Sequence, residues 1–194
     1  MRLQGILISA RFPCMVRVEA IIILLVPVER EIFEALEGET LGWACIGPLL
    51  LQVRGKDDRT KAEMYQALGE GQRGLFLFRA YHNHACRSAV EWYWWTCEQL
   101  RKPKAWEALL AGLRFYGADE TLRVMNKAET ALDRTNRLSN GSWMEASALD
   151  LDRDPELRSL SEHLFAEYTS AAESAHRLIA AYIKSHPNQF VLLS

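Results

Sequence analysis

Between residues 29 and 186 the apolar side chains of this chain recur every three or four positions, the period of an α-helix with one buried face. The longest such pattern follows Asp154 and Pro155, a pair typical of a helix N-cap and first helical position. Its apolar positions are Leu157, Leu160, Leu164, Tyr168, Ala171, Ala175, Leu178 and Tyr182. Because Pro187 cannot continue a helix, we expect residues 190–193 to form a tail.

Prolines, capping residues and glycines divide the preceding chain into shorter helices. We expect helices to start near Pro27, Thr40, Thr60, Gln72, Ser88, Pro103 and Asp119, with glycine stops at Gly38, Gly69 and Gly117. Pro48 is expected to kink or break the second helix, and residues 139–142 mark an irregular connection. The pattern therefore predicts an all-α, single-domain bundle of about seven or eight helices with a long C-terminal helix.

The helix expected after Ser88 contains four consecutive aromatic residues. Ser88 and Glu91 have the spacing of a capping box, in which the serine oxygen accepts the third amide and the glutamate reaches back. The helix is apolar almost all round, which predicts a position at the centre of the core. Its large or apolar residues are Val90, Trp92, Tyr93, Trp94, Trp95, Cys97 and Leu100. An aromatic platform for a flat ligand or for bases is the alternative, but no arginine or lysine is interleaved with these rings.

The N-terminal part of the chain carries an unbroken apolar run, Ala20 to Val28. A membrane span needs about 20 apolar residues, and charged residues interrupt the stretch before this run, so we expect no membrane segment. The β-branched residues at 21–26 instead predict a buried strand or an extended arm over the helices. We therefore divide the chain into an apolar N-terminal arm, residues 1–28, and a helical domain, residues 29–194. A later translation start, for example at Met15, would remove much of the arm.

Charge and cysteine usage narrow the class of protein. The 194 residues carry a formal net charge of −2, and 49% of them are hydrophobic, enough for one sizeable core. Domains that bind nucleic acid directly usually have a strong basic excess, so we expect no direct nucleic-acid partner. The four cysteines, Cys14, Cys45, Cys86 and Cys97, form no CxxC pair and lie beside apolar residues. They predict buried thiols in a reducing, cytoplasmic compartment.

Two polar features near the aromatic helix are candidates for a ligand or metal site. His82 and Cys86 are four residues apart and would share a helix face, with His84 on another face. With a remote carboxylate this pair could hold zinc, which needs three or four protein ligands. The default interpretation is hydrogen bonding at a helix end. Glu91, an acid among tryptophans, would need His82, Arg79 or Arg87 as a partner if buried, but the capping box explains it without catalysis.

The chain shows no sequence signature of a catalytic site. It has no GxSxG motif, no glycine-rich phosphate loop and no HExxH motif. We therefore predict no catalytic residue and no cofactor.

Acidic residues are concentrated between residues 145 and 173, where eight carboxylates and two arginines give a net charge of −6. Such a surface could bind a basic protein partner. The candidate residues of this acidic face are Asp150, Asp152, Asp154, Glu156, Glu162 and Glu167. The alternative interpretation is the solvated face of a helix.

Three segments carry a resemblance to a known family. They are GQRGLFLFRAYHNHACRSAVEWYWW (71–95), PKAWEALLAGLRFYGADETLRVMNKAETAL (103–132) and YIKSHPNQFV (182–191). Together they resemble a bacterial domain-of-unknown-function family related to the DNA mimic protein 19-like C-terminal domain, over residues 29–191. The resemblance implies an all-helical fold, and it brings over no catalytic residue.

The same resemblance implies a possible kind of partner. One distant relative imitates DNA with surface carboxylates and thereby occupies a DNA-binding regulator. This chain departs from that pattern in its near-neutral charge, and Leu75 and Phe76 stand where more distant relatives have a glycine pair. The resemblance therefore does not carry the mimic role over to this chain.

Two hypotheses of function follow from these observations. The first is a non-enzymatic interaction or regulatory protein that uses the acidic face against a basic protein, such as a DNA-binding regulator. The second is a small-ligand or metal-dependent function around His82, Cys86 and Glu91. The two differ in whether the aromatic helix fills the interior or frames a cleft lined by imidazoles and a carboxylate.

Overall fold

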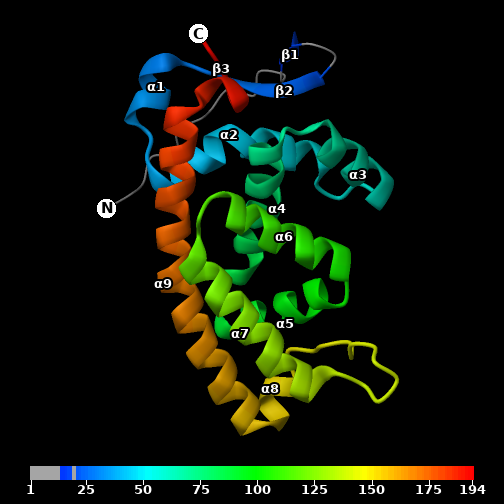
Figure 1. The fold of residues 1–194 in the computed structure, drawn as a ribbon. Helices are drawn as coiled ribbons and strands as arrows, with labels where there is room; N and C mark the ends of the chain where they lie inside the picture. The colour runs from blue at the N-terminus through cyan, green and yellow to red at the C-terminus, as the bar shows by residue number, and fades with distance from the viewer. Residues whose placement is uncertain (1–13, 19–20) are drawn as a thin grey trace.

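The computed structural model describes residues 14–18 and 21–194, and within these ranges the chain is predominantly helical (Figure 1). The predicted all-α class is confirmed, with nine α-helices in the described ranges. They are α1 (Arg30–Ala35), α2 (Gly38–Val53), α3 (Asp58–Ala67), α4 (Glu70–Ala85), α5 (Ala89–Leu100), α6 (Pro103–Phe115), α7 (Asp119–Asn136), α8 (Asp150–Arg153) and α9 (Pro155–Ser185). None of these helices is long and apolar enough to cross a membrane.

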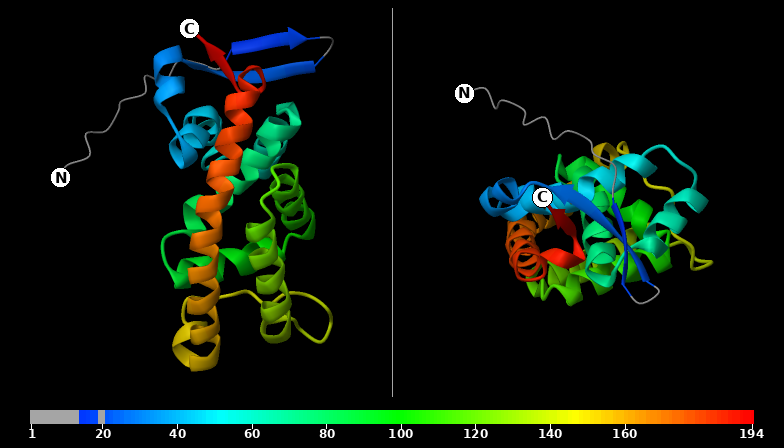
Figure 2. Two further views of the ribbon diagram at one scale, coloured as in Figure 1. Left: turned by 60° about the vertical axis from the view of Figure 1, so that its left-hand side comes forward. Right: turned by 90° about the horizontal axis from the view of Figure 1, so that it is seen from above.

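Helix α9 is the longest element and runs along the length of the molecule (Figures 1 and 2). The Asp154 side chain caps it as predicted, accepting hydrogen bonds from the amides of Glu156 and Leu157 at 3.0 Å each. Its apolar stripe packs against α2, α5 and α7. Leu178, expected on the buried face, is 40% exposed, whereas His176 is buried in the stripe. Near the C-terminal end of the helix, the predicted apolar positions therefore no longer match the face that is buried.

Three short strands form a sheet across one end of the helices (Figures 1 and 2). β2 (Ile21–Val28) pairs antiparallel with β1 (Cys14–Val18) and parallel with β3 (Val191–Leu193). The expected strand at 21–26 is confirmed and extends to Val28. The part of the predicted arm before Cys14 lies outside the described residues.

The expectation of a C-terminal tail at 190–193 is wrong, because the chain after α9 forms the 3-10 helix η1 (Pro187–Gln189) and then β3. The Val26 amide donates to the Phe190 carbonyl at 3.1 Å. Phe190 itself is fully buried. Main-chain pairing and this aromatic anchor therefore join the predicted arm to the C-terminal end of the helical part.

Several predicted helix starts are displaced. Pro27 lies inside β2, where it pairs in register with Leu192, and the first helix begins only at Arg30. Gly38, expected to end that helix, instead begins α2 with a φ of +47°. Thr40 lies in the first turn of α2, and its hydroxyl donates to the Glu37 carbonyl at 2.7 Å. A polar residue near the start of a pattern thus marks a helix terminus only to within a few positions.

Two other capping predictions are corrected. Asp57, three residues before Thr60, caps α3, since its carboxylate accepts from the Thr60 amide at 2.7 Å. Asp119 is the first residue of α7, with Ala118 at the N-cap position and no side-chain cap.

Pro48 lies inside α2, which runs unbroken from Gly38 to Val53. Packing of α2 against α9, α4 and β2 is sufficient to maintain the helix across the missing amide hydrogen.

The aromatic helix α5 is only partly central. Trp92 and Tyr93 are fully buried, but Trp94 is 38% exposed and Trp95 is half-buried. Cys45 and Cys97 are buried as expected. Cys86 is exposed, so the prediction of a buried thiol is wrong at this position. It occupies the C-cap of α4, where the chain turns toward α5 and lies at the surface.

Candidate functional site

A groove of about 1370 Å³ lies between α2, α3, α4 and α6. Most of its lining is apolar. The apolar side chains come from all four helices and from the segment around α1, and they are Ile32, Leu36, Trp43, Leu50, Leu51, Val53, Ala62, Tyr65, Phe76, Leu77, Ala80, Ala105 and Ala108. Leu51 is 55% exposed, which leaves part of this lining open to solvent.

The charged residues of the groove are predominantly cationic. Five cations, Arg54, Lys61, Arg79, Arg87 and Lys104, line it together with one acid, Glu39. Lys61 lies 3.5 Å from Asp58 and Arg87 lies 3.8 Å from Glu91. Such exposed ion pairs contribute little to stability, and salt screens them. Arg54 and Lys104 form no ion pair with any residue that the structure describes.

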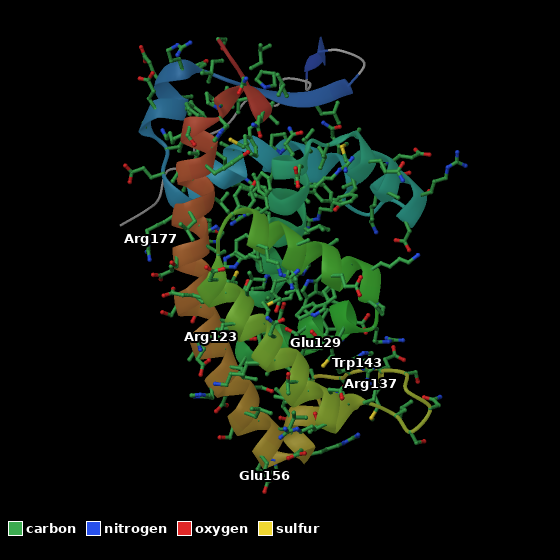
Figure 3. The ribbon with its side chains drawn as sticks, viewed as in Figure 1. Arg123, Glu129, Arg137, Trp143, Glu156 and Arg177 are labelled. Atoms are coloured by element: carbon green, nitrogen blue, oxygen red, sulfur yellow. The ribbon has the colours of Figure 1, made fainter. Side chains whose placement is uncertain are left out.

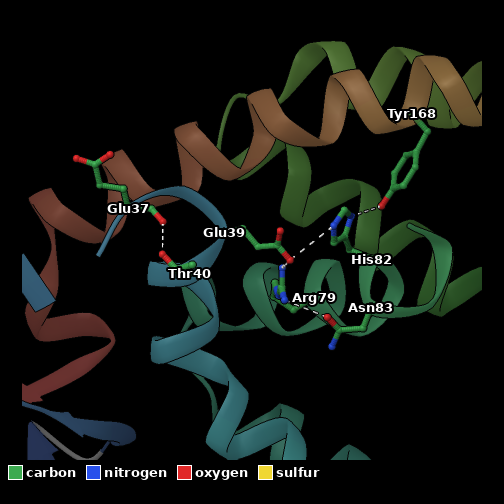
Figure 4. A network of polar contacts seen from close by, with 7 residues as sticks. All are labelled: Glu37, Glu39, Thr40, Arg79, His82, Asn83 and Tyr168. Carbon is green, nitrogen blue, oxygen red and sulfur yellow. Dashed lines mark hydrogen bonds and ion pairs between the residues drawn. The ribbon is translucent and has the colours of Figure 1, made fainter. Parts of the chain in front are cut away.

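At one side of the groove Arg79 forms an ion pair with Glu39 (Figure 4). The guanidinium is almost completely buried, and its Nη1 donates to Glu39 Oε1 at 2.7 Å while Nη2 donates to Asn83 Oδ1 at 3.0 Å. The same guanidinium lies 5.4 Å from the centre of the Trp43 ring. Partial burial raises the pKa of Glu39, but the hydrogen bond and charge of Arg79 outweigh it, so the net pKa lies below the usual carboxyl value.

Two buried histidines lie next to this ion pair. His82 Nε2 is 3.9 Å from Glu39 Oε1, and His82 Nδ1 forms a 2.8 Å hydrogen bond with the Tyr168 hydroxyl (Figure 4). The His176 ring packs edge-on against His82, with centroids 4.6 Å apart, and tilted against Phe78 at 5.0 Å. We call Glu39, Arg79, His82 and His176 the inner cluster.

Burial keeps both histidines of the inner cluster neutral. It is the main cause that lowers the pKa of His82 to about 4, with the charge of Arg79 adding to it. It is also the main cause that lowers the pKa of His176 to about 3, with His82 and Arg79 adding to it. At neutral pH both rings are therefore uncharged, and each has one unprotonated nitrogen. His176 Nε2 is buried and has no hydrogen-bond partner among the described residues.

The four candidate ligands near the aromatic helix do not converge on one point. His82 is in the inner cluster, whereas His84 lines the groove and stacks on Trp95 with centroids 4.1 Å apart. Cys86 is exposed at the end of α4. Glu91 is half-buried at the start of α5 and lies near Arg87, one of the three partners expected for it. Ser88 Oγ accepts from the Glu91 amide at 3.1 Å, which confirms the serine half of the expected cap.

Sequence reasoning missed Glu39 and His176 as neighbours of His82. Glu39 lies in the first turn of α2, where an acid is expected for the helix dipole alone. The burial of His176 was predictable, because it lies eight residues after Tyr168 and so falls on the buried stripe of α9. A histidine at a core position of an amphipathic helix needs a polar partner from another element.

The acidic face is largely engaged within the molecule. Asp154 caps α9, and Asp150 accepts from the Tyr93 hydroxyl at 3.1 Å and from the Ser147 amide at 2.7 Å. Glu167 pairs with Lys127 at 2.6 Å. Arg158 hydrogen-bonds Asp152 and lies 3.9 Å from Glu162. Glu156 is exposed at the end of the molecule where α9 begins (Figure 3). Most of these carboxylates thus have structural partners.

Comparisons of the chain with known protein families, with curated proteins and with solved structures find no match. The resemblance to the DNA mimic-related family is not tested by them and stays a prediction.

Proposed function

We propose that the protein binds a small amphipathic anion, a molecule with an apolar chain or ring and one acidic group, in the groove between α2, α3, α4 and α6. The observation that carries this proposal is the combination of an apolar lining with a cationic surplus in one hollow. Ligand sites in proteins are typically concave, mostly apolar and supplied with a few oriented polar groups.

The apolar lining supports a ligand with a sizeable apolar part. Leu51 is exposed, and Leu50 and Leu77 are only partly covered. Leu50 and Leu51 are neighbours on α2, Leu77 is on α4, and all three line the same hollow. Apolar surface that is gathered in one concave patch is typical of a binding site, whereas singly scattered leucines need no explanation. A ligand that covers these side chains gains about 25 cal/mol for each Å² of apolar surface removed from water.

The charges support an anionic group on that ligand. Glu39, the single acid among the described lining residues, is already neutralised by Arg79, so the remaining cations set the sign of the local potential. Arg54 and Lys104 are the cations without an ion-pair partner among the described side chains, and they are the strongest candidates to bind the acidic group.

A fluorescence titration with 1-anilinonaphthalene-8-sulfonate, an aromatic sulfonate, tests this proposal. We expect saturable binding at one site per chain and displacement by dodecanoate, but not by dodecyltrimethylammonium at the same concentration. Ala80→Trp places a large ring in the groove and should weaken binding at least tenfold. Ala166→Trp, at an exposed position of α9 outside the groove, is the matched control and should bind as the unmodified chain does.

Charge reversal separates the cationic contribution from the apolar one. Arg54→Glu with Lys104→Glu should weaken binding of dodecanoate, whereas Arg134→Glu with Arg177→Glu, which makes the same change in net charge away from the groove, should leave it unchanged. Circular dichroism and cooperative unfolding verify that each variant folds. Binding that is equally weakened by both charge pairs, or that survives Ala80→Trp, contradicts a site in the groove.

The interaction hypothesis rests on different residues. We keep as a second proposal that the exposed carboxylates of the acidic face, Glu156 foremost, bind a basic protein partner such as a DNA-binding regulator. Affinity capture at low and moderate salt tests it with Glu156→Gln and Asp152→Asn, because changing Asp154 would also remove the cap of α9. Unchanged capture by these variants contradicts the idea.

We also infer a cytoplasmic location. The proposal is supported by Cys45, Cys86 and Cys97, which are all free thiols. Proteins of oxidising compartments usually form disulfides.

A further inference from the structure

We propose that Glu39, His82 and His176 form a binding site for a divalent transition-metal ion of the zinc class. One potential ligand atom from each of the three side chains lies within 4.8 Å of the other two. The proposal uses the inner cluster and does not depend on ligand binding in the groove.

The three side chains come from helices that are far apart in the sequence. Glu39 is in the first turn of α2, His82 is near the end of α4, and His176 is in the second half of α9. α9 packs against α2. Two imidazole nitrogens and one carboxylate oxygen are borderline donors that suit Zn²⁺ and similar ions, and three protein ligands leave a fourth position for a water or a ligand group.

His176 supplies an independent observation that points to a ligand. Its side chain is 5% exposed, and its Nε2 has no hydrogen-bond partner among the described atoms. Buried polar atoms in folded proteins are almost always paired with protein, water or an ion. A metal ion bound at Nε2 would give this nitrogen the partner that it lacks.

The hydrogen bonding of His82 suits a ligand role as well. Its Nδ1 is engaged by the Tyr168 hydroxyl at 2.8 Å, and its Nε2 is directed toward Glu39. When Nδ1 carries the proton and donates it to the hydroxyl, the Nε2 lone pair is free for the metal. Metal-binding histidines typically fix their other ring nitrogen in this way.

The site has to contract to bind a metal. Zinc bonds of about 2.0 to 2.2 Å place tetrahedral ligand atoms about 3.3 Å apart, whereas Glu39 Oε1 and His82 Nε2 are 3.9 Å apart. Glu39 can supply the movement, because its side chain is 53% exposed. Arg79 shares this carboxylate, and its positive charge weakens cation binding. We therefore expect a dissociation constant of about 1 μM, well short of the tightest zinc sites.

Calorimetric titration of the chelator-treated full chain with Zn²⁺, together with absorption spectra of the Co²⁺ form, tests the proposal. We expect one ion per chain and visible Co²⁺ bands of a four- or five-coordinate site. His176→Leu should weaken Zn²⁺ binding roughly 100-fold. His163→Leu, an exposed histidine on the same helix, and Cys86→Ser are the matched controls and should bind Zn²⁺ as the unmodified chain does.

Glu39→Gln keeps the test decisive if His176→Leu does not fold, because Glu39 is near the surface and the change is isosteric. It should also weaken Zn²⁺ binding strongly. The proposal is overturned if the unmodified chain binds no stoichiometric Zn²⁺, if His176→Leu or a folded Glu39→Gln retains full affinity, or if Cys86→Ser abolishes binding. Titration of the unmodified chain with the aromatic sulfonate tests the groove in a separate measurement, so failure of the metal site and failure of the groove are distinguishable.

Discussion

Packing alone does not explain the surroundings of His176. It lies in the apolar stripe of α9, against Phe78 and His82, and its Nε2 has no hydrogen-bond partner in the part of the chain that the structure describes. A buried polar atom without a partner costs about 1 to 3 kcal/mol. If the side chain only filled space in the core, leucine would do so without leaving a buried polar atom unpaired. This free-energy cost is explained if the nitrogen binds a metal ion.

In the metal-free protein, His176→Leu should leave the free energy of unfolding at pH 7 unchanged or raise it by about 1 kcal/mol, because leucine has a similar volume and no unpaired polar atom. Urea unfolding in the presence of a chelator measures this change. Loss of more than about 2 kcal/mol would mean that the ring makes stabilising contacts that this interpretation overlooks.

Stability should fall as the pH is lowered from about 6.5 to 4.5. Burial lowers the pKa of His176 to about 3 and that of His82 to about 4, whereas both are near 6.5 in the unfolded chain. In this interval the unfolded chain binds more protons than the folded one, so stability rises with pH and is lost on acidification. We expect His176→Leu to reduce the loss by about 2 kcal/mol, since each pKa unit corresponds to 1.36 kcal/mol. Equal pH dependence in both proteins would contradict neutral buried histidines.

The sequence indicated part of this site and could not indicate the rest. His82 was a candidate ligand because of its polar neighbours in the sequence, and it lies in the inner cluster. Its partners come from α2 and α9, and contacts between distant helices depend on their crossing geometry, which spacing within one segment does not contain. Cys86 shares a helical spacing with His82, but it lies where α4 ends and the surface begins.

Among the elements, the crossing of α4 and α6 depends on two glycines. A Cβ on Gly112 would lie 2.6 Å from the Cα of Gly74. Both helices contribute to the lining of the groove, so their close approach sets the positions of Leu77 and Lys104. The glycines therefore have a packing role that overrides their poor helix propensity.

Gly112→Ala should destabilise the protein by about 1 to 3 kcal/mol, because the backbones of α4 and α6 must separate. Gly42→Ala is the matched control, since its Cβ would be 3.4 Å from the nearest atom, a methyl group of Leu75. There the change should be neutral or stabilising by up to about 1 kcal/mol through helix propensity. Thermal or urea unfolding of both variants checks the contrast, and similar effects of both would contradict it.

At the start of α9, Asp154→Ala should cost about 1 kcal/mol, because two backbone amides lose their acceptor. Glu156→Ala, two residues later, should cost less, since this exposed side chain makes no ion pair with a described residue. Unfolding measurements on the two variants separate a structural acid from a surface acid. Equal costs would argue against the capping role.

At the scale of the whole molecule, α9 is the axis along which the other elements are arranged (Figures 1 and 2). Its long periodic pattern made the helix and the all-α class predictable from the sequence. The sheet was predictable only at β2, because β3 has three residues and pairs with a strand near the other end of the chain. The groove was not predictable either, since its lining comes from helices that meet only after folding.

The most direct test of ligand binding in the groove is methyl NMR of the protein with bound dodecanoate. We expect intermolecular nuclear Overhauser effects from the alkyl chain to the methyl groups of Leu50, Leu51 and Leu77. The exposed leucines elsewhere, Leu138, Leu149 and Leu178, should show none. Contacts spread evenly over both sets, or confined to the second set, would contradict a groove that binds an amphipathic anion.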